Sequence, residues 1–446
     1  MRASPLPFAI LILLAGCVAD GPVDEDPTPA PSTVRQQPEF CGAPSVAIEP
    51  SLIGYRATTD HYTLDLAIDE EEARTLAAMA ELAFEAFGAY FLSDVEPAEP
   101  FEAFLDPDET AWGARIAADG LEVPWGAGGY FHSATNRAYL YRQPTVYFTR
   151  QLFIHEIAHQ FHSAARDNGG LPSWYVEGTA EFISRFDWDG ECLRLGVMPT
   201  LTFEDLPAQA VEDLDAEALD LAAWIDGAGF PGRPLMLELF RYFETHTERA
   251  PAWLEVREAF DLGEPPDADG VAALLGIDAL AEVEPDFDSF VRADPEPMEP
   301  VWLEWLHRTP TSVRGWALDG TLSVARAKEP APLQAKAESP AGTDGAPGLL
   351  LAWDSADDYT VLLLDGDGQL SRWHRVGGEL EWTDVTATAA PGDDPVSLSI
   401  LGWTDNGAQV AVGDDEFVVD IAASPASGLA VWNTDVVFTD LVREAP

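Results

Sequence analysis

The chain has very few positive charges. It contains 24 Lys and Arg against 78 Asp and Glu, a formal net charge of −54, and its only lysines are Lys328 and Lys336. A surface with this charge repels phosphate backbones and anionic lipid headgroups, so nucleic acid is excluded as a partner. We interpret the acidic excess as a source of solubility, with dissolved salt screening the repulsion. A preference for cationic substrates is the functional alternative.

Long apolar runs are also absent. The apolar stretch at residues 6–14 follows Arg2, is interrupted by Pro7 and is too short to cross a bilayer as a helix. A short apolar stretch behind a positive charge is typical of an export signal. The stretch ends in Leu14-Ala15-Gly16-Cys17, which resembles the bacterial lipobox. That resemblance implies cleavage before Cys17 and lipid attachment to its thiol; an ordinary signal peptide with a chance cysteine is the alternative.

Residues 1–17 are therefore predicted to be a lipoprotein signal. Residues 18–39, rich in Asp, Glu, Pro, Thr and Ser, form a predicted disordered tether. We expect a lipid-anchored protein of the bacterial cell envelope, on the outer membrane or cell surface rather than the inner membrane. The chain has three cysteines. If Cys17 carries lipid, Cys41 and Cys192 remain to form a disulfide in an oxidising compartment.

The sequence His155-Glu156-Ile157-Ala158-His159 carries the strongest chemical signal. On a helix, residues four apart share a face, so His155 and His159 can bind one ion. Glu156 lies beside them and can take a proton from water as a general base. A hydrolytic zinc site needs three protein ligands and one open position, so a third ligand is required.

Glu177 is the candidate for that ligand. Residues 168–172, Asn-Gly-Gly-Leu-Pro, predict the end of the first helix, and Ser173 offers an N-cap for a second helix at Trp174–Phe186. A short reversal between the two helices would bring Glu177 over the histidines. Glu181, one turn further, is placed to hold the outer nitrogen of a ligating histidine.

HEIAH followed by PSWYVEGTAEF resembles the gluzincin metallopeptidases, specifically the peptidase MA-like group. The upstream residues 128–141 also resemble that group, in which they form a turn and the edge strand over the active-site cleft. The resemblance implies a zinc ion bound by His155, His159 and Glu177, with Glu156 as the general base. It is clear over residues 120–190 and looser over residues 55–309.

Gluzincins also use a Tyr or His to stabilise the oxyanion. Residues 229–232 read Gly-Phe-Pro-Gly where a Tyr is often found, so the later Tyr242 and His246 are the candidates, with a structural role in an amphipathic helix as the alternative. His162 lies too far along the helix axis to complete a compact tetrahedron. We interpret it as structural, together with His61, His307 and His374, whereas His132 is a candidate to line the cleft.

The chain length suits two domains. Strands are expected at residues 61–66, 102–105 and 138–141, and helices at residues 73–90, 235–243 and 301–307. From about Thr311, short alternating strands appear, at residues 349–353, 359–364, 396–401 and 417–419, and the Asp365–Gly368 turn predicts a hairpin rather than a calcium loop.

Residues 348–353, 357–359, 428–432 and 437–440 resemble concanavalin-like jelly rolls of the laminin-G kind. Such folds often bind glycans, so the resemblance implies glycan binding by this domain. The predicted fold class is α+β: a mainly helical metallopeptidase domain with a small sheet at 40–309, followed by an all-β jelly-roll sandwich at 310–446.

The expected function is that of an exported, lipid-anchored zinc metallopeptidase that hydrolyses peptide bonds. Its expected partners are a peptide or protein substrate, the membrane through Cys17, and a cell-surface polysaccharide as a ligand of the C-terminal domain. The alternative is a surface lipoprotein whose metal site is vestigial and whose jelly roll binds glycan or protein.

Overall fold

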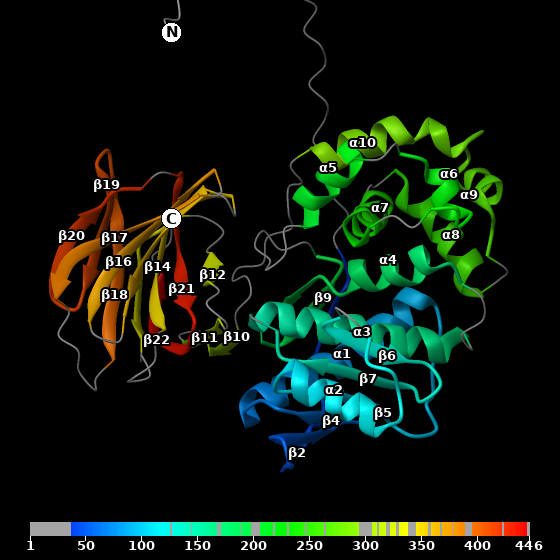
Figure 1. The fold of residues 1–446 in the computed structure, drawn as a ribbon, viewed down its shortest axis with the longest axis horizontal. Helices are drawn as coiled ribbons and strands as arrows, with labels where there is room; N and C mark the ends of the chain where they lie inside the picture. Colours follow the sequence, from blue (N-terminus) through cyan, green and yellow to red (C-terminus); the bar gives the residue numbers. More distant parts are fainter. Residues whose placement is uncertain are drawn as a thin grey trace, which may run out of the picture.

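The structure is a computed structural model. It describes residues 37–443 except 125–126, 144, 167–170, 189, 198–205, 217–218, 230–231, 246–247, 263–264, 294–305, 310–311, 318–321, 327–329, 338–344, 356–357, 366–367, 378, 389–394 and 422. The predicted signal, Cys17 and most of the tether lie outside these residues. Figure 1 shows a body of helices around a sheet and a second body made of strands.

A six-stranded mixed sheet forms the base of the first body. Its strand order is β2-β3-β4-β5-β7-β6, with β5 parallel to both β4 and β7 and the other pairs antiparallel. The strands are β2 (Ala47–Pro50), β3 (Tyr55–Thr58), β4 (Tyr62–Leu66), β5 (Phe101–Asp106), β6 (Gly129–His132) and β7 (Arg137–Tyr141). The predicted strands at 61–66, 102–105 and 138–141 are confirmed as β4, β5 and β7.

Helices cover both faces of this sheet. One face and the long helices α1 (Glu70–Phe91) and α3 (Val146–Arg166) share the main core, which includes Leu64, Leu105 and Leu140. The other face packs Tyr139 against Trp112 of α2 (Glu109–Ala118). Alternate residues of β5 and β7 therefore point into two separate apolar layers, because side chains alternate along a strand.

The second helix of the predicted pair is α4 (Ser173–Ile183), and it lies beside α3 (Figure 1). The prediction is wrong at both ends. Pro172, not Ser173, is at the N-cap position and makes no side-chain cap bond, and Phe186 begins strand β8 (Phe186–Trp188). An aromatic residue fits a strand as well as a buried helix face, so the pattern did not mark the end of the helix.

Further helices complete the first body. They are α5 (Leu206–Ala216), α6 (Leu221–Ile225), α7 (Arg233–Thr245), α8 (Ala250–Leu262), α9 (Ala268–Leu275), η1 (Leu280–Glu282) and α10 (Glu284–Arg292). The predicted helix at 235–243 is confirmed as part of α7. Among the described helices, none combines the length and the apolar composition that crossing a bilayer requires.

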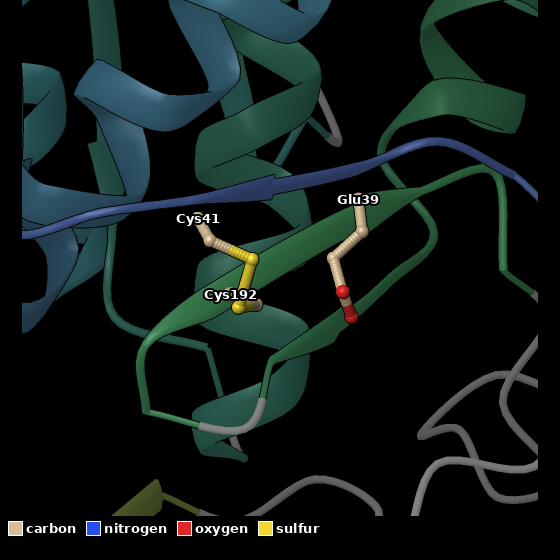
Figure 2. Close-up of side chains that lie close together, drawn as sticks. All are labelled: Glu39, Cys41 and Cys192. Carbon is tan, nitrogen blue, oxygen red and sulfur yellow. A yellow bond between two sulfur atoms is a disulfide. The ribbon is translucent and has the colours of Figure 1, made fainter.

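The predicted disulfide is confirmed. It joins Cys41 of β1 (Glu39–Cys41) to Cys192 of β9 (Cys192–Leu195), within a three-stranded sheet of order β1-β9-β8 (Figure 2). The two cysteines are opposite each other in the β1–β9 register. The bond therefore links the start of the described chain to the segment that follows α4.

The second body is a β-sandwich of two antiparallel sheets. The seven-stranded sheet, of order β10-β11-β22-β13-β18-β19-β20, contains β10 (Leu306–Thr309), β11 (Ser312–Trp316), β13 (Leu333–Ala337), β18 (Val396–Thr404), β19 (Gly407–Val412), β20 (Asp415–Val419) and β22 (Asp435–Arg443). The six-stranded sheet, of order β12-β21-β14-β15-β16-β17, contains β12 (Leu322–Arg326), β14 (Ala346–Ser355), β15 (Asp358–Leu364), β16 (Gln369–Val376), β17 (Glu379–Thr388) and β21 (Pro425–Trp432). The strands expected at 349–353, 359–364, 396–401 and 417–419 all lie within these sheets.

The structure differs from the sequence expectations at the start of this region. His307 lies in strand β10, so the predicted helix at 301–307 is wrong over its described residues. The expected boundary after residue 309 falls between β10 and β11, which pair with each other in the sandwich. Gly366 and Asp367 of the predicted turn lie outside the described residues. The flanking strands β15 and β16 pair antiparallel, as the predicted hairpin requires, and the carbonyl of Asp365 accepts a hydrogen bond from the Gly368 amide (3.0 Å).

Candidate functional site

Helix α3 carries both histidines of the motif on one buried face. The side chains of His155 and His159 are 7% and 10% exposed, and their Nε2 atoms lie 3.0 Å apart. The helix begins after Thr145, whose Oγ1 accepts a hydrogen bond from the Phe148 amide (3.1 Å). A buried bidentate ion pair between Arg150 and Glu72 of α1 (2.7 and 2.8 Å) also anchors it. The backbone that presents the histidines is therefore held on two sides.

Helix α4 brings Glu177 to the same point. Its Oε2 lies 3.5 Å from the Nε2 atoms of both His155 and His159. The next residue, Gly178, allows α4 to pack closely on α7, since a Cβ there would lie 2.5 Å from Cε2 of Phe240. Of the two neighbouring residues in the motif, Glu177 thus faces the histidines and Gly178 allows the close packing of α4 on α7.

The three side chains fit a zinc ion. Their ligand atoms form a triangle with sides of 3.0, 3.5 and 3.5 Å. Ligand atoms at ~2.1 Å from zinc in a tetrahedron lie about 3.4 Å apart, close to these values. Burial acts to raise the pKa of Glu177, but its interactions with the two histidines hold that pKa well below its usual range. The carboxylate is therefore ionised, as a metal ligand must be.

Glu181 lies behind His155, as the sequence predicted. It is fully buried, and its Oε1 is 3.6 Å from Nδ1 of His155, which has no hydrogen-bond partner among the described residues. This contact is electrostatic at that length. Burial acts to raise the pKa of Glu181, but the charges of Arg233, His155 and Arg185 lower it. The negative charge beside His155 favours Nε2 as the nitrogen that faces the other two ligands.

Two arginines hold Glu181. Arg233, at the start of α7, donates from Nε to Oε1 (2.6 Å), and Arg185 donates from Nη2 to Oε2 (3.0 Å). Arg185 is buried, whereas the side chain of Arg233 is 43% exposed. Sequence reasoning missed both residues. The spacing of four residues between Glu181 and Arg185 was a usable local signal, but Arg233 is 52 positions away and has none.

Glu156 is buried against the edge strand. Its burial raises its pKa, and the charges of His155, His159 and Arg233 oppose that rise. A pKa moved toward neutrality suits a carboxylate that must accept and return a proton. A Cβ on Gly129 of β6 would lie 2.5 Å from Oε1 of Glu156, so only glycine leaves room for the carboxylate.

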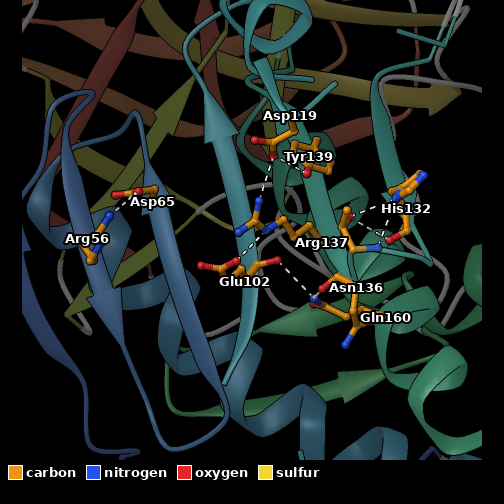
Figure 3. A network of polar contacts seen from close by, with 10 residues as sticks. Arg56, Asp65, Glu102, Asp119, His132, Asn136, Arg137, Tyr139 and Gln160 are labelled. Carbon is orange, nitrogen blue, oxygen red and sulfur yellow. Dashed lines mark hydrogen bonds and ion pairs between the residues drawn. The ribbon is translucent and has the colours of Figure 1, made fainter. Parts of the chain in front are cut away.

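The β6–β7 hairpin covers one side of the site. Phe131 of β6 stacks on His159, with ring centroids 6.4 Å apart. Gln160, the residue after His159, is fully buried and donates to the carbonyl oxygens of Asn136 (2.6 Å) and Glu102 (3.2 Å). Figure 3 shows Gln160 reaching the turn of the hairpin at Asn136, whose φ of 51° is left-handed. The β6–β7 hairpin and helix α3 are thus fastened together by a side chain that the sequence did not single out.

The other histidine predictions have mixed outcomes. His132 lies at the hairpin turn, where its Nδ1 contacts Oγ1 of Thr135 (3.1 Å; Figure 3), so its described contact is within the hairpin rather than with Glu156 or the triangle. His162 is buried and contacts Asp261 (3.0 Å), a structural setting as predicted. His61 stacks on Phe84 of α1 (3.7 Å), and His374 lies in β16.

Of the two oxyanion candidates, Tyr242 is described by the structure, and its contacts lie away from the site. Tyr242 is 1% exposed and packs on Phe287 and Phe290 of α10, at ring distances of 5.5 and 5.3 Å. It therefore has the structural role that was the alternative. His246 lies outside the described residues.

The chain was compared with known proteins. No family model matches the sequence, and no curated protein matches it. The carbohydrate-binding module CBM66 from Bacillus subtilis is 17% identical, with a TM-score of 0.26 over 32% of this chain and 91% of that one. A toad ovary galectin in complex with thio-digalactose is 11% identical, with a TM-score of 0.23 over 28% of this chain and 100% of the galectin. LamAcat from Zobellia galactanivorans is 11% identical, with a TM-score of 0.22 over 30% of this chain and 77% of that one.

Proposed function

We propose that the chain is a zinc metallopeptidase of the gluzincin type. The observation that carries this proposal is the triangle formed by Nε2 of His155, Nε2 of His159 and Oε2 of Glu177, with the buried carboxylate of Glu156 beside it. Two neutral imidazoles and one carboxylate are a common ligand set of hydrolytic zinc, and they leave one position open for water or substrate.

The protein side chains divide the chemistry of peptide hydrolysis. Zinc, when bound, polarises the scissile carbonyl and lowers the pKa of water. Glu156 accepts a proton from the attacking water as the oxygen adds to the carbonyl carbon. It then gives that proton to the amine nitrogen as the carbon–nitrogen bond breaks. The raised pKa of Glu156 favours the first of these transfers, because a stronger base takes the proton from water more readily.

Strand β6 is the proposed substrate-binding edge. It ends the six-stranded sheet, with β7 as its partner on one side. An extended peptide can add to such an edge through backbone hydrogen bonds. Gly129 of this strand lies against Glu156, so a peptide paired there would run past the general base. The exposed part of Arg233 places a positive charge near the same carboxylate.

The test is Glu156→Gln, with zinc content and peptide cleavage measured on the same sample. Zinc should remain at one equivalent, while kcat/KM falls at least about 100-fold, the usual contribution of a general base. Glu85→Gln, at an exposed position of α1, is the matched control and should behave as the wild type. Undiminished cleavage by the Glu156 variant, or wild-type protein that neither binds zinc nor cleaves casein, would sink the proposal.

A second function is proposed for the sandwich, namely binding of a neutral glycan. Trp373 of β16 and Trp382 of β17 face each other in the register, and Trp382 is 65% exposed. Indole faces pack well against apolar ligand surfaces while polar neighbours supply hydrogen bonds. Ser371 and Asp384 are the next register pair on the same face. The net charge of −54 disfavours anionic glycans.

Trp382→Ala tests this second function in affinity electrophoresis through gels that contain a β-glucan, a galactan or a levan. Retardation by at least one of these should be lost in the variant. Leu401→Ala, at a 44% exposed apolar position of β18 in the other sheet, is the control and should keep it. Equal retardation of both variants would reject Trp382 as part of a glycan site.

Export and lipid anchoring are proposed from the sequence alone, since Cys17 lies outside the described residues. A lipid on Cys17 would hold the chain at the bacterial envelope with its acidic domains in the surrounding medium. Cys17→Ser should move the protein from the membrane fraction to the soluble fraction and abolish incorporation of labelled palmitate.

A further inference from the structure

A buried carboxylate outside the metal site contacts both helices that carry the three candidate ligands. Asp261, in the last turn of α8, is 6% exposed. Its Oδ1 lies 3.0 Å from Nε2 of His162 on α3, and its Oδ2 accepts a hydrogen bond from the hydroxyl of Tyr175 on α4 (2.9 Å). A carboxylate only accepts hydrogen bonds, so Nε2 of His162 is the donor in the first contact.

Both contacts lie close to a ligand along the chain. His162 follows His159 by three residues, and Tyr175 precedes Glu177 by two. At ~1.5 Å per residue, these offsets are about 4.5 and 3 Å along the two helix axes. The carboxylate therefore joins α3 and α4 within one helical turn of a ligand on each.

Ring contacts hold both hydrogen-bond partners of Asp261 in place. His162 stacks on Phe91 of α1, with centroids 4.3 Å apart and an interplanar angle of 20°. Tyr175 stacks on Phe260 of α8, at 4.4 Å and 15°. If α3 slid against α4, one of the two hydrogen bonds would break and leave a buried carboxylate without full compensation, which is costly. These contacts therefore oppose a change in the separation of α3 and α4.

We propose that Asp261 is a positioning residue for the metal site. It holds α3 and α4 at the spacing that brings Glu177 to His155 and His159, although it contacts none of the three. The proposal rests on the zinc site of the proposed function. In this proposal His162, which is not a ligand in the motif, links helix α3 to α8.

The test is a competition titration of zinc against a chromophoric chelator, on the full chain, with folding followed separately by circular dichroism. Asp261→Ala should weaken zinc affinity about tenfold, at the low end of what residues that orient ligands contribute. Asp261→Asn keeps the size of the side chain, and its amide can still accept from Nε2 of His162 and donate to the hydroxyl oxygen of Tyr175, so this variant should bind zinc within about threefold of wild type. Tyr175→Phe, which keeps the ring on Phe260, should fall between them. Asp286→Ala, at an exposed partner of Arg249, is the control and should match wild type.

The outcomes separate this inference from the peptidase proposal. Wild-type zinc affinity in folded Asp261→Ala and Tyr175→Phe would overturn the positioning role while leaving the peptidase proposal intact. Weakened zinc binding in these variants, beside a wild type that binds zinc but cleaves no peptide, would support the positioning role and reject the peptidase. A wild type that binds no zinc would overturn both.

Discussion

Gly129 and Glu156 are in contact across the boundary between the edge strand β6 and helix α3. A Cβ on Gly129 would lie 2.5 Å from Oε1 and 2.8 Å from Cγ of Glu156. The carboxylate thus occupies the space that any other residue at position 129 would fill. The position of the proposed general base depends on a residue in another element, 27 positions earlier in the chain.

Gly129→Ala should reduce kcat/KM at least about tenfold, because displacing a catalytic group by even ~1 Å is costly. Zinc content should stay at the wild-type level, since none of the three ligands touches position 129. Gly113→Ala is the matched control, because its new Cβ would make only ordinary contact with Val123 at 3.8 Å. Equal activity in the two variants would show that Glu156 tolerates the displacement.

Gln160→Ala should loosen the β6–β7 hairpin. Loss of the two hydrogen bonds leaves the carbonyls of Asn136 and Glu102 without that donor, at a cost of about 1–3 kcal/mol in the free energy of unfolding. If β6 binds the peptide, KM should rise more than kcat falls. Urea denaturation and steady-state kinetics measure the two effects. Gln209→Ala, at an exposed position of α5, should change neither, and an unaltered KM in Gln160→Ala would separate the hairpin from substrate binding.

Zinc affinity should depend on pH through His159. Burial alone would lower the pKa of this histidine, but its contacts with Glu177 and the neighbouring carboxylates raise it above the ordinary value. Zinc binds only the neutral imidazole, so protons compete as the pH falls through that raised pKa. Affinity should therefore begin to fall above pH ~6.5, the ordinary histidine value. Glu177→Gln removes the raising group, so its remaining zinc affinity should fall only at a lower pH, as a titration from pH 8 to 5 would reveal.

The Cys41–Cys192 disulfide should contribute several kcal/mol to stability. It closes a loop of 151 residues, and the loss of chain entropy in the unfolded state predicts about 5 kcal/mol. Urea denaturation of the double variant Cys41→Ser/Cys192→Ser should show this loss. Reduced wild-type protein should behave in the same way, whereas unequal midpoints for the two would point to an effect of the serines themselves.

Local patterns identified the residues of the candidate site because each pattern depends on short spacings. The four-residue interval between His155 and His159 places both on one helix face, and the same interval relates Glu177 to Glu181. Alternating apolar residues likewise identified strands such as β15 and β18. These periods are properties of the backbone itself, so they are readable without knowledge of the fold.

The same patterns failed where a helix and a strand would show the same apolar residues. Phe186 continued the apolar spacing of α4 but begins β8, and His307 continued a predicted helix but lies in β10. Apolar residues are compatible with a helix face or a strand face, and packing partners far along the chain decide between them.

The sequence alone determined which residues could serve as ligands and as base, through their type and their spacing along one helix and the next. Only the tertiary structure decided that Glu177 meets both histidines and that Gly129 makes room for Glu156. It also decided that Arg233 contacts Glu181 and that Asp261 contacts Tyr175, each from another helix. Those contacts join positions tens of residues apart. Their distances are set by how whole helices and strands pack, which no local pattern encodes.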